Sequence, residues 1–162
     1  LAASVKDAAE HVMIVDLERN DLGRVCRYGS VRVSRMMEVE SYPGVHHLVS
    51  TVEGGLRDGL DACDCILECF PGGSITGAPK ARSMQIIRGL EPNARGVYTG
   101  SVGYLGFDGD ADLNIAIRTI LVKDEALYLS LGGGIVWDSN PEREYQETLD
   151  KGSKFFEALD NG

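Results

Sequence analysis

The stretch YTGSVGYLGFDGDADLNIAIRTILVKDEALYLSL, residues 98–131, decides the fold class of this chain. It contains three segments rich in β-branched and aromatic residues, at 98–107, 113–122 and 126–131. The Asp/Gly-rich turn 108–112 and the short turn 123–125 separate them. Strands joined by turns this short pair antiparallel, because a parallel connection needs a long crossover. The stretch therefore predicts antiparallel pairing.

The flanking sequence adds a second strand pair and several helices. Strands are predicted at 31–39 and 45–52, on either side of Ser41-Tyr42-Pro43-Gly44. Apolar spacing predicts helices at about 4–23, 56–69 and 79–90, and a last helix from Asn140-Pro141. Antiparallel sheets with helices packed outside them make the expected fold α+β. A length of 162 residues fits one domain, 1–162.

Composition excludes several classes of function. A net charge of −9, with no basic stripe, argues against nucleic acid as a partner. No apolar run approaches the roughly 20 residues that cross a bilayer, so no membrane role is expected. Four cysteines without zinc-ligand spacing indicate reduced thiols in a cytoplasmic protein.

The last helix carries the most informative pattern. Glu144, Glu147 and Lys151 share one side of the helix at spacings of three and four residues. Two carboxylates and an ammonium suit Mg²⁺ with an anionic ligand attached to it. The alternative is a solvated face with a weak Glu147–Lys151 pair. A separate apolar sector, expected to face the core, holds Tyr145, Leu149, Gly152, Phe156 and Leu159.

Two Gly-rich segments offer further candidate sites. The loop 70–80, FPGGSITGAPK, leads into a helix and could bind a carboxylate or a phosphate, although it is not a P-loop. A tight, capped turn is the alternative. Gly132, Gly133 and Gly134 end a strand and would let the backbone approach a ligand closely, or form a bulge.

Two kinds of single residue also stand out. Arg118 lies in an otherwise apolar predicted strand, so it requires an anion, either a ligand carboxylate or a structural partner. His11, His46 and His47 lie near predicted secondary structure, where a lone histidine is more often structural than catalytic.

Seven stretches, in order along nearly the whole chain, resemble the chorismate-binding enzymes. They are 9–25, 47–50, 71–80, 98–104, 117–119, 132–139 and 144–151. The family includes anthranilate synthases, aminodeoxychorismate synthases, isochorismate synthases and salicylate synthases. The resemblance implies an α+β fold of two stacked antiparallel sheets with outer helices.

The resemblance also implies residue roles. Glu10 and Glu147 would bind Mg²⁺, with Glu144 beside them through water. Lys151 and the backbone of Gly132–Gly134 would support the ring carboxylate of chorismate. The enolpyruvyl carboxylate would be bound by Tyr98 and Arg118. Ser74 would contribute a hydroxyl, and His47 would lie against the ring near the reacting carbons.

The amino-acid sequences of two motifs favour one branch of the family. Residues 71–80 and 144–148 resemble component I of aminodeoxychorismate synthases, which aminate chorismate with ammonia from a glutamine amidotransferase partner. Anthranilate synthase component I is the alternative within the family. The family's catalytic module is longer, so the resemblance implies a C-terminal portion of one catalytic domain. The upstream Pro-Ile-(Lys or Ala)-Gly-Thr motif and general-acid Glu are not in this sequence. The isolated chain is therefore expected to be inactive. The alternative to an enzyme function is a fragment that binds metal and carboxylate without catalysing a reaction.

Overall fold

The computed structural model describes residues 5–42 and 45–160, which form two compact units. The first holds the described residues up to Pro92 together with Tyr104–Asp112. The second holds Asn93–Gly103 and the described residues from Leu113 onward. Helices and two-stranded antiparallel pairs make up both, as the α+β expectation requires.

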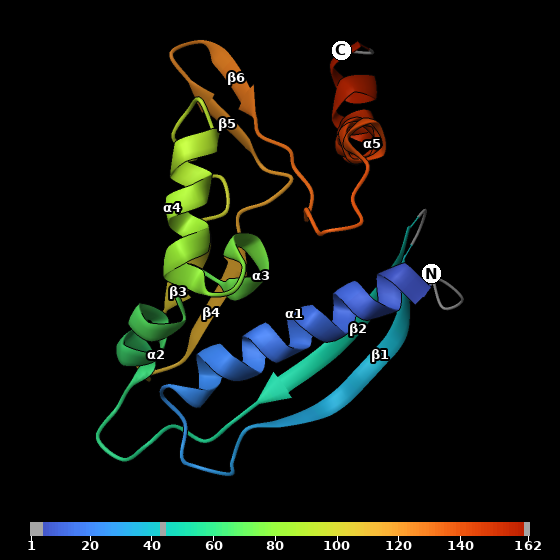
Figure 1. Ribbon diagram of the computed structural model, residues 1–162. Coiled ribbons are helices and arrows are strands. Elements are labelled where there is room, and N and C mark those ends of the chain that lie inside the picture. Colours follow the sequence, from blue (N-terminus) through green and yellow to red (C-terminus); the bar gives the residue numbers. More distant parts are fainter. Residues whose placement is uncertain (1–4, 43–44, 161–162) are drawn as a thin grey trace. The chain divides into compact units, whose positions relative to one another are not determined.

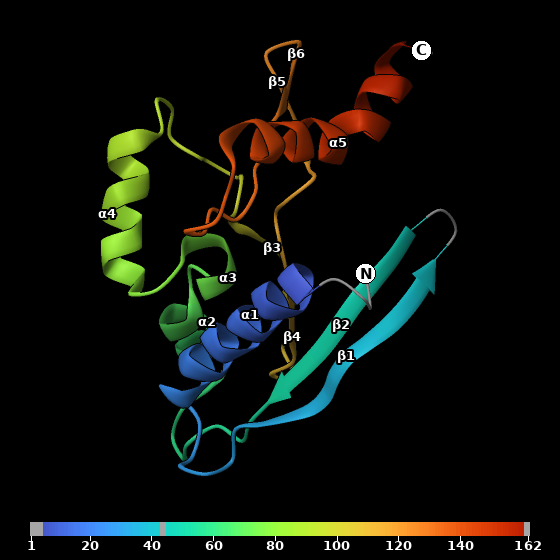
Figure 2. The ribbon, with the colours of Figure 1, turned by 45° about the vertical axis from the view of Figure 1, so that its right-hand side comes forward.

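The first unit is built on a long helix and a β-hairpin. Helix α1 (Val5–Gly23) lies along the hairpin of β1 (Arg32–Tyr42) and β2 (Val45–Glu53), as Figures 1 and 2 show. Both predicted strands are confirmed, and β1 extends through Ser41 and Tyr42. Pro43 and Gly44 of the predicted turn lie outside the described residues.

The β1–β2 register is interrupted on either side of Arg35. Met37 there has a φ of 53°, an uncommon conformation for a residue with a side chain. The Ser50 hydroxyl accepts the Met37 N–H at 2.8 Å and lies 2.6 Å from His11 Nε2 of α1. This serine therefore ties the irregular strand to the helix beside it.

Three shorter helices complete the first unit: α2 (Ala62–Cys69), α3 (Gly73–Thr76) and α4 (Lys80–Leu90). The prediction of a helix from residue 56 is wrong, because α2 begins only at Ala62. Asp61 caps α2 by accepting the N–H groups of Cys63 and Asp64. Leu56 instead forms an isolated β-bridge with Cys26.

The stretch 98–131 forms two hairpins rather than three strands. Strands β3 (Ser101–Leu105) and β4 (Ala111–Ile115) form one pair, and β5 (Ile120–Lys123) and β6 (Ala126–Leu129) the other. The expected middle strand is therefore broken between Ile115 and Ile120. Arg118 in that gap has a φ of 50°, which interrupts the extended backbone.

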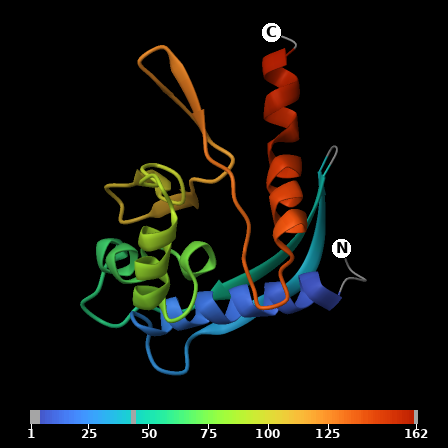
Figure 3. The ribbon, with the colours of Figure 1, turned by 45° about the horizontal axis from the view of Figure 1, so that its top comes forward.

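The second unit ends in α5 (Pro141–Asp160), which follows an extended segment through the Gly-rich stretch (Figure 3). The helix was predicted from Asn140-Pro141, but its expected core face differs. Gly152 of the expected core face is buried, but Tyr145, Leu149, Phe156 and Leu159 are exposed, and Glu144 of the charged face is buried instead. A Cβ on Gly152 would lie 2.5 Å from Leu131 Cδ1, so the missing side chain permits this close contact. None of the helices described here has the length and apolar character needed to cross a membrane.

Candidate functional site

The candidate residues divide between the two units. The second unit contains most of them: Tyr98, Arg118, Gly132, Gly133, Gly134, Glu144, Glu147 and Lys151. The first unit contains Glu10, His47 and Ser74.

One cavity in the second unit brings together four of the predicted residues. It has a volume of about 140 Å³ and is lined by Tyr98, Arg118, Gly132 and Lys151, with Ile117, Ser130 and Leu131. A Cβ on Gly132 would lie only 2.7 Å from the Tyr98 hydroxyl, so glycine permits the approach of that hydroxyl. The cavity thus combines two cations with a phenol.

Arg118 lies in a different structural setting from the one predicted. It was expected to be a charged residue in an apolar strand, but it is exposed and lies between β4 and β5. The Ile117 N–H donates to the carbonyl of Ile115 at 2.8 Å, closing a tight local turn before Arg118. Arg118 is therefore an exposed residue that lines a cavity, and it is not a buried charge in a sheet.

Gly133 marks the point where charged side chains of α5 converge. A Cβ at this glycine would lie 3.5 Å from Glu144 Oε2, 3.7 Å from Lys151 Nζ and 3.9 Å from Glu147 Oε1. Lys151 also pairs with Glu147 at 2.7 Å and donates to the carbonyl of Gly132 at 3.3 Å. We call Gly133 and these three side chains the Gly133 cradle. No heavy atom lies near the corresponding position on Gly134.

Glu144 is the buried member of the cradle, with 7% of its surface exposed. Its Oε1 accepts the hydroxyl of Ser139 at 2.7 Å. We did not single out Ser139 from the sequence, although it lies in one of the matched stretches. The signal that could have identified it is a serine shortly before an acidic helix start.

The carboxylates of the cradle are of the kind that binds Mg²⁺. Among residues 5–42 and 45–160, no group of three or more His, Cys, Asp or Glu side chains is arranged to hold a metal. The cradle does present two carboxylates of adjacent helical turns to one glycine. Mg²⁺ usually takes only one or two protein carboxylates and keeps several waters. Glu147 therefore fits the role of a direct ligand, and Glu144 that of a neighbour through water.

The loop 70–80 in the first unit is held by a buried ion pair. Lys80 Nζ lies 2.8 Å from Asp21 Oδ1 and donates to the carbonyl of Cys69 at 3.0 Å. The second Asp21 oxygen accepts the Gly73 N–H at 3.1 Å. These contacts occupy the lysine and one of the loop N–H groups, so the local geometry favours a structural turn over an anion site. The expected cap by Ser or Thr is absent from α3 and α4, and Asp21 accepts the Gly73 N–H instead.

Ser74 lies in the short helix α3 and hydrogen-bonds to Glu18 of α1. Burial raises the pKa of the Glu18 carboxyl, and the nearby charge of Asp21 adds to this shift. The bond from Ser74 and the charge of Lys80 act in the opposite direction. The Ser74 hydroxyl thus already has a carboxylate partner within the first unit.

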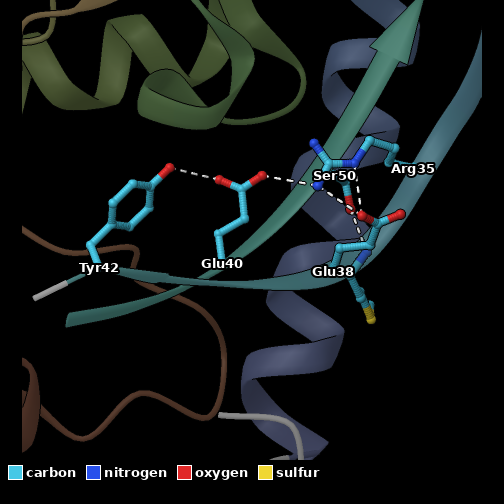
Figure 4. A network of polar contacts seen from close by, with 6 residues as sticks. Arg35, Glu38, Glu40, Tyr42 and Ser50 are labelled. Atoms are coloured by element: carbon cyan, nitrogen blue, oxygen red, sulfur yellow. Dashed lines mark hydrogen bonds and ion pairs between the residues drawn. The ribbon is translucent and has the colours of Figure 1, made fainter.

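His47 lies on β2, exposed and directly across from Glu40 of β1. Its ring makes an edge contact with Tyr42, with centroids 5.9 Å apart. Figure 4 shows Glu40 between Tyr42 and Arg35, which bind it at 2.9 Å each. Hydrogen bonds from Tyr42 and Arg35 lower the pKa of Glu40, so a carboxylate faces the histidine. Glu10, the remaining candidate, is half-buried on α1.

Comparison with known proteins shows the family of the chain. The model of the family described as chorismate binding enzyme matches residues 1–157. Anthranilate synthase component 1 1 of Haloarcula marismortui is 57% identical over 96% of this chain and 32% of its own length. Aminodeoxychorismate synthase component 1 of Salmonella typhimurium is 55% identical over 99% of this chain and 36% of its own length.

A solved structure agrees with the sequence matches. Anthranilate synthase component I from Streptococcus pneumoniae superimposes with a TM-score of 0.86 and 48% identity. The match covers 93% of this chain and 35% of that protein. The present chain therefore spans about a third of the length of the relatives it matches.

Proposed function

The chain belongs to the family of chorismate-binding enzymes, and from this premise we propose that it forms the substrate- and metal-anchoring part of a chorismate-aminating synthase. The observation that carries the proposal is the Gly133 cradle. There two carboxylates and an ammonium converge on a glycine next to a cavity lined by Arg118 and Tyr98. A dianion such as chorismate needs cationic partners at both of its carboxylates.

We assign the two substrate carboxylates to different groups. Arg118 and Tyr98 would bind the enolpyruvyl carboxylate, since a guanidinium presents a fork of donors that matches a carboxylate. Lys151 and the backbone of Gly132–Gly134 would support the ring carboxylate. Lys151 lines the same cavity as Arg118, and its Nζ already donates to the Gly132 carbonyl.

The metal in this proposal is Mg²⁺, with Glu147 as the ligand from the cradle and Glu144 beside it through water. The family resemblance assigns Glu10 as a second ligand. When bound, the ion would neutralise the ring carboxylate while the C4 hydroxyl leaves and nitrogen enters. The ammonium of Lys151 would keep Glu147 oriented toward the glycine stretch. His47 would lie against the ring, with the Glu40 carboxylate across the strand pair orienting it. Ser74 would add its hydroxyl once it exchanges its Glu18 partner.

The proposed product is 4-amino-4-deoxychorismate, with ammonia supplied by a glutamine amidotransferase partner. Gly73 and Ser74 favour it, because anthranilate synthases more often carry Ala and Thr there. Relatives named for either activity are nearly equally similar, at 57% and 55% identity. Anthranilate synthase component I is therefore the second candidate. Four free thiols fit a reducing compartment, so we place the protein in the cytoplasm.

The test is a product assay on the protein expressed from the complete gene. Chorismate, ammonium and Mg²⁺ should yield aminodeoxychorismate, and Glu147→Gln should severely reduce both turnover and Mg²⁺ dependence. Anthranilate as the product would move the assignment to the second candidate. The 162-residue chain assayed beside it should give no product, because general acid–base assistance to the leaving hydroxyl has no assigned residue here. Turnover by the short chain would overturn this division of labour.

A further inference from the structure

The two carboxylate oxygens of Glu144 face different groups. Oε1 accepts the Ser139 hydroxyl at 2.7 Å. Oε2 is the atom nearest to the Cβ position of Gly133, at 3.5 Å. A carboxylate rotates about its last torsion at little cost, because such sp³–sp² torsions are broad. The bond to Ser139 therefore holds Oε1, and Oε2 is the oxygen that lies toward the cradle.

The hydroxyl of Ser139 is itself fixed by the backbone. It accepts the Val136 N–H at 3.0 Å, while the Ser139 N–H donates to the Val136 carbonyl at 3.0 Å. A hydroxyl has a single proton, so acceptance from Val136 leaves that proton for Glu144. The serine thus joins a closed turn to a buried carboxylate in one fixed direction.

Ser139 is not needed to start the helix. Asn140 performs that role, because its Oδ1 accepts the Arg143 N–H at 3.1 Å and its carbonyl accepts the Glu144 N–H at 3.0 Å. A serine near a helix start usually caps the first turn. Here a neighbour caps the helix, and the serine hydroxyl is directed to an acidic side chain.

We propose that Ser139 is a positioning residue for Glu144, holding one oxygen so that the other faces the Gly133 cradle and whatever cation is bound there. This inference rests on the function proposed above. Loss of an outer-shell partner of a direct metal ligand typically costs 10–100-fold in metal affinity or activity. Glu144 would reach the ion through water, so loss of the Ser139 hydroxyl should weaken Mg²⁺ binding by about tenfold, the lower end of that range.

The experiment compares Ser139→Ala with Ser139→Thr in the protein expressed from the complete gene. The threonine variant keeps the hydroxyl and should restore binding. Ser153→Ala is the matched control, since Ser153 is an exposed serine of α5 that bonds only to the carbonyl of Asp150 in the described contacts. Calorimetric titration with Mg²⁺ alone gives the dissociation constant, and urea unfolding gives the folded fraction.

The expected result is a Mg²⁺ dissociation constant raised about tenfold in Ser139→Ala, with wild-type values in Ser139→Thr and Ser153→Ala. If Ser139→Ala lowers the free energy of unfolding in urea but leaves the Mg²⁺ dissociation constant unchanged, the serine is purely structural and the inference is overturned. Glu147→Gln is measured in parallel. If it weakens Mg²⁺ binding and Ser139→Ala does not, only this inference fails. If neither variant changes the affinity, the proposed metal site fails, and the inference with it.

Discussion

The Gly-rich segments at 71–80 and 131–134 are built from the same chemical parts. Each brings a lysine and a carboxylate from helices to a glycine backbone. In the first segment the pair is nearly dry, with 14% of the Lys80 side chain and 4% of the Asp21 side chain exposed. In the second, 28% of Lys151 and 48% of Glu147 are exposed, next to a cavity.

This difference in burial separates a structural pair from a candidate ligand site. A buried ion pair has already lost its hydration and is fully occupied by its own partner. An exposed pair is held weakly and can exchange its partner for a ligand at little cost. The same residue types at a Gly-rich segment thus serve different purposes, and four measurements would break or sharpen the contrast.

The largest expected effect is on the buried pair. Lys80→Met leaves Asp21 buried without its cation, which should lower the unfolding free energy by about 3–5 kcal/mol. Lys151→Met, the matched variant in the second segment, should cost no more than about 1 kcal/mol. Urea unfolding measures both. Adding Asp21→Asn to Lys80→Met should recover much of the loss, and equal costs for the two lysines would remove the contrast.

A matched pair of glycine variants probes the space around each segment. A Cβ on Gly73 would lie 3.0 Å from Leu17 Cβ and 3.3 Å from Asp21 Oδ2, so Gly73→Ala should destabilise the fold by about 1–3 kcal/mol. A Cβ on Gly133 meets only ordinary contacts, so Gly133→Ala should fold normally yet fill the cradle. Gly73→Ala should therefore lower the stability measured by urea unfolding, and Gly133→Ala should weaken the binding measured by chorismate titration. Unchanged ligand binding in Gly133→Ala would remove the cradle from the site.

Arg118→Gly should separate binding from stability at a single position. Glycine adopts the positive φ of Arg118 without the steric cost of a side chain, so the unfolding free energy should change by less than about 1 kcal/mol. Substrate affinity should fall about tenfold or more, because hydrogen bonds to a charged group contribute roughly 1.5–3 kcal/mol. Unchanged affinity combined with a lower melting temperature would make Arg118 structural.

The smallest expected effect is the pH dependence contributed by Glu18. Its pKa is raised above the ordinary 4.5, so the folded state binds the proton more tightly than the unfolded state does. Stability from this group is present below pH 4.5 and is lost as the pH rises through the higher folded value. In Glu18→Gln the free energy of unfolding should decrease less as the pH rises, as measured by urea unfolding at a series of pH values.

Ser74→Ala offers a counterpart to that variant. The bond from Ser74 lowers the pKa of Glu18, so its removal should move the loss of stability to a higher pH. If stability is lost at the same pH as in the wild type, or at a lower pH, the assigned contact between Ser74 and Glu18 is contradicted.

Local sequence patterns determined most of the secondary structure. The α+β class, both strands of the first hairpin and the start of the last helix follow from apolar spacing, turn residues and Asn140-Pro141. These features depend on neighbours within a few residues, which the sequence lists directly. The grouping of Glu144, Glu147 and Lys151 was predicted for the same reason, because spacings of three and four residues place side chains on one side of a helix.

Only the tertiary structure decided what each charged group does. The break at Arg118 depends on a single backbone torsion, which apolar periodicity does not encode. The buried pairing of Lys80 was not predicted from the sequence, since its partner Asp21 lies 59 positions earlier on another helix. The role proposed for Ser139 depends on the burial of Glu144, which the spacing of charged residues in α5 does not predict. Burial is a property of the whole packed unit, and burial determines whether a charge is paired permanently or remains available to a ligand.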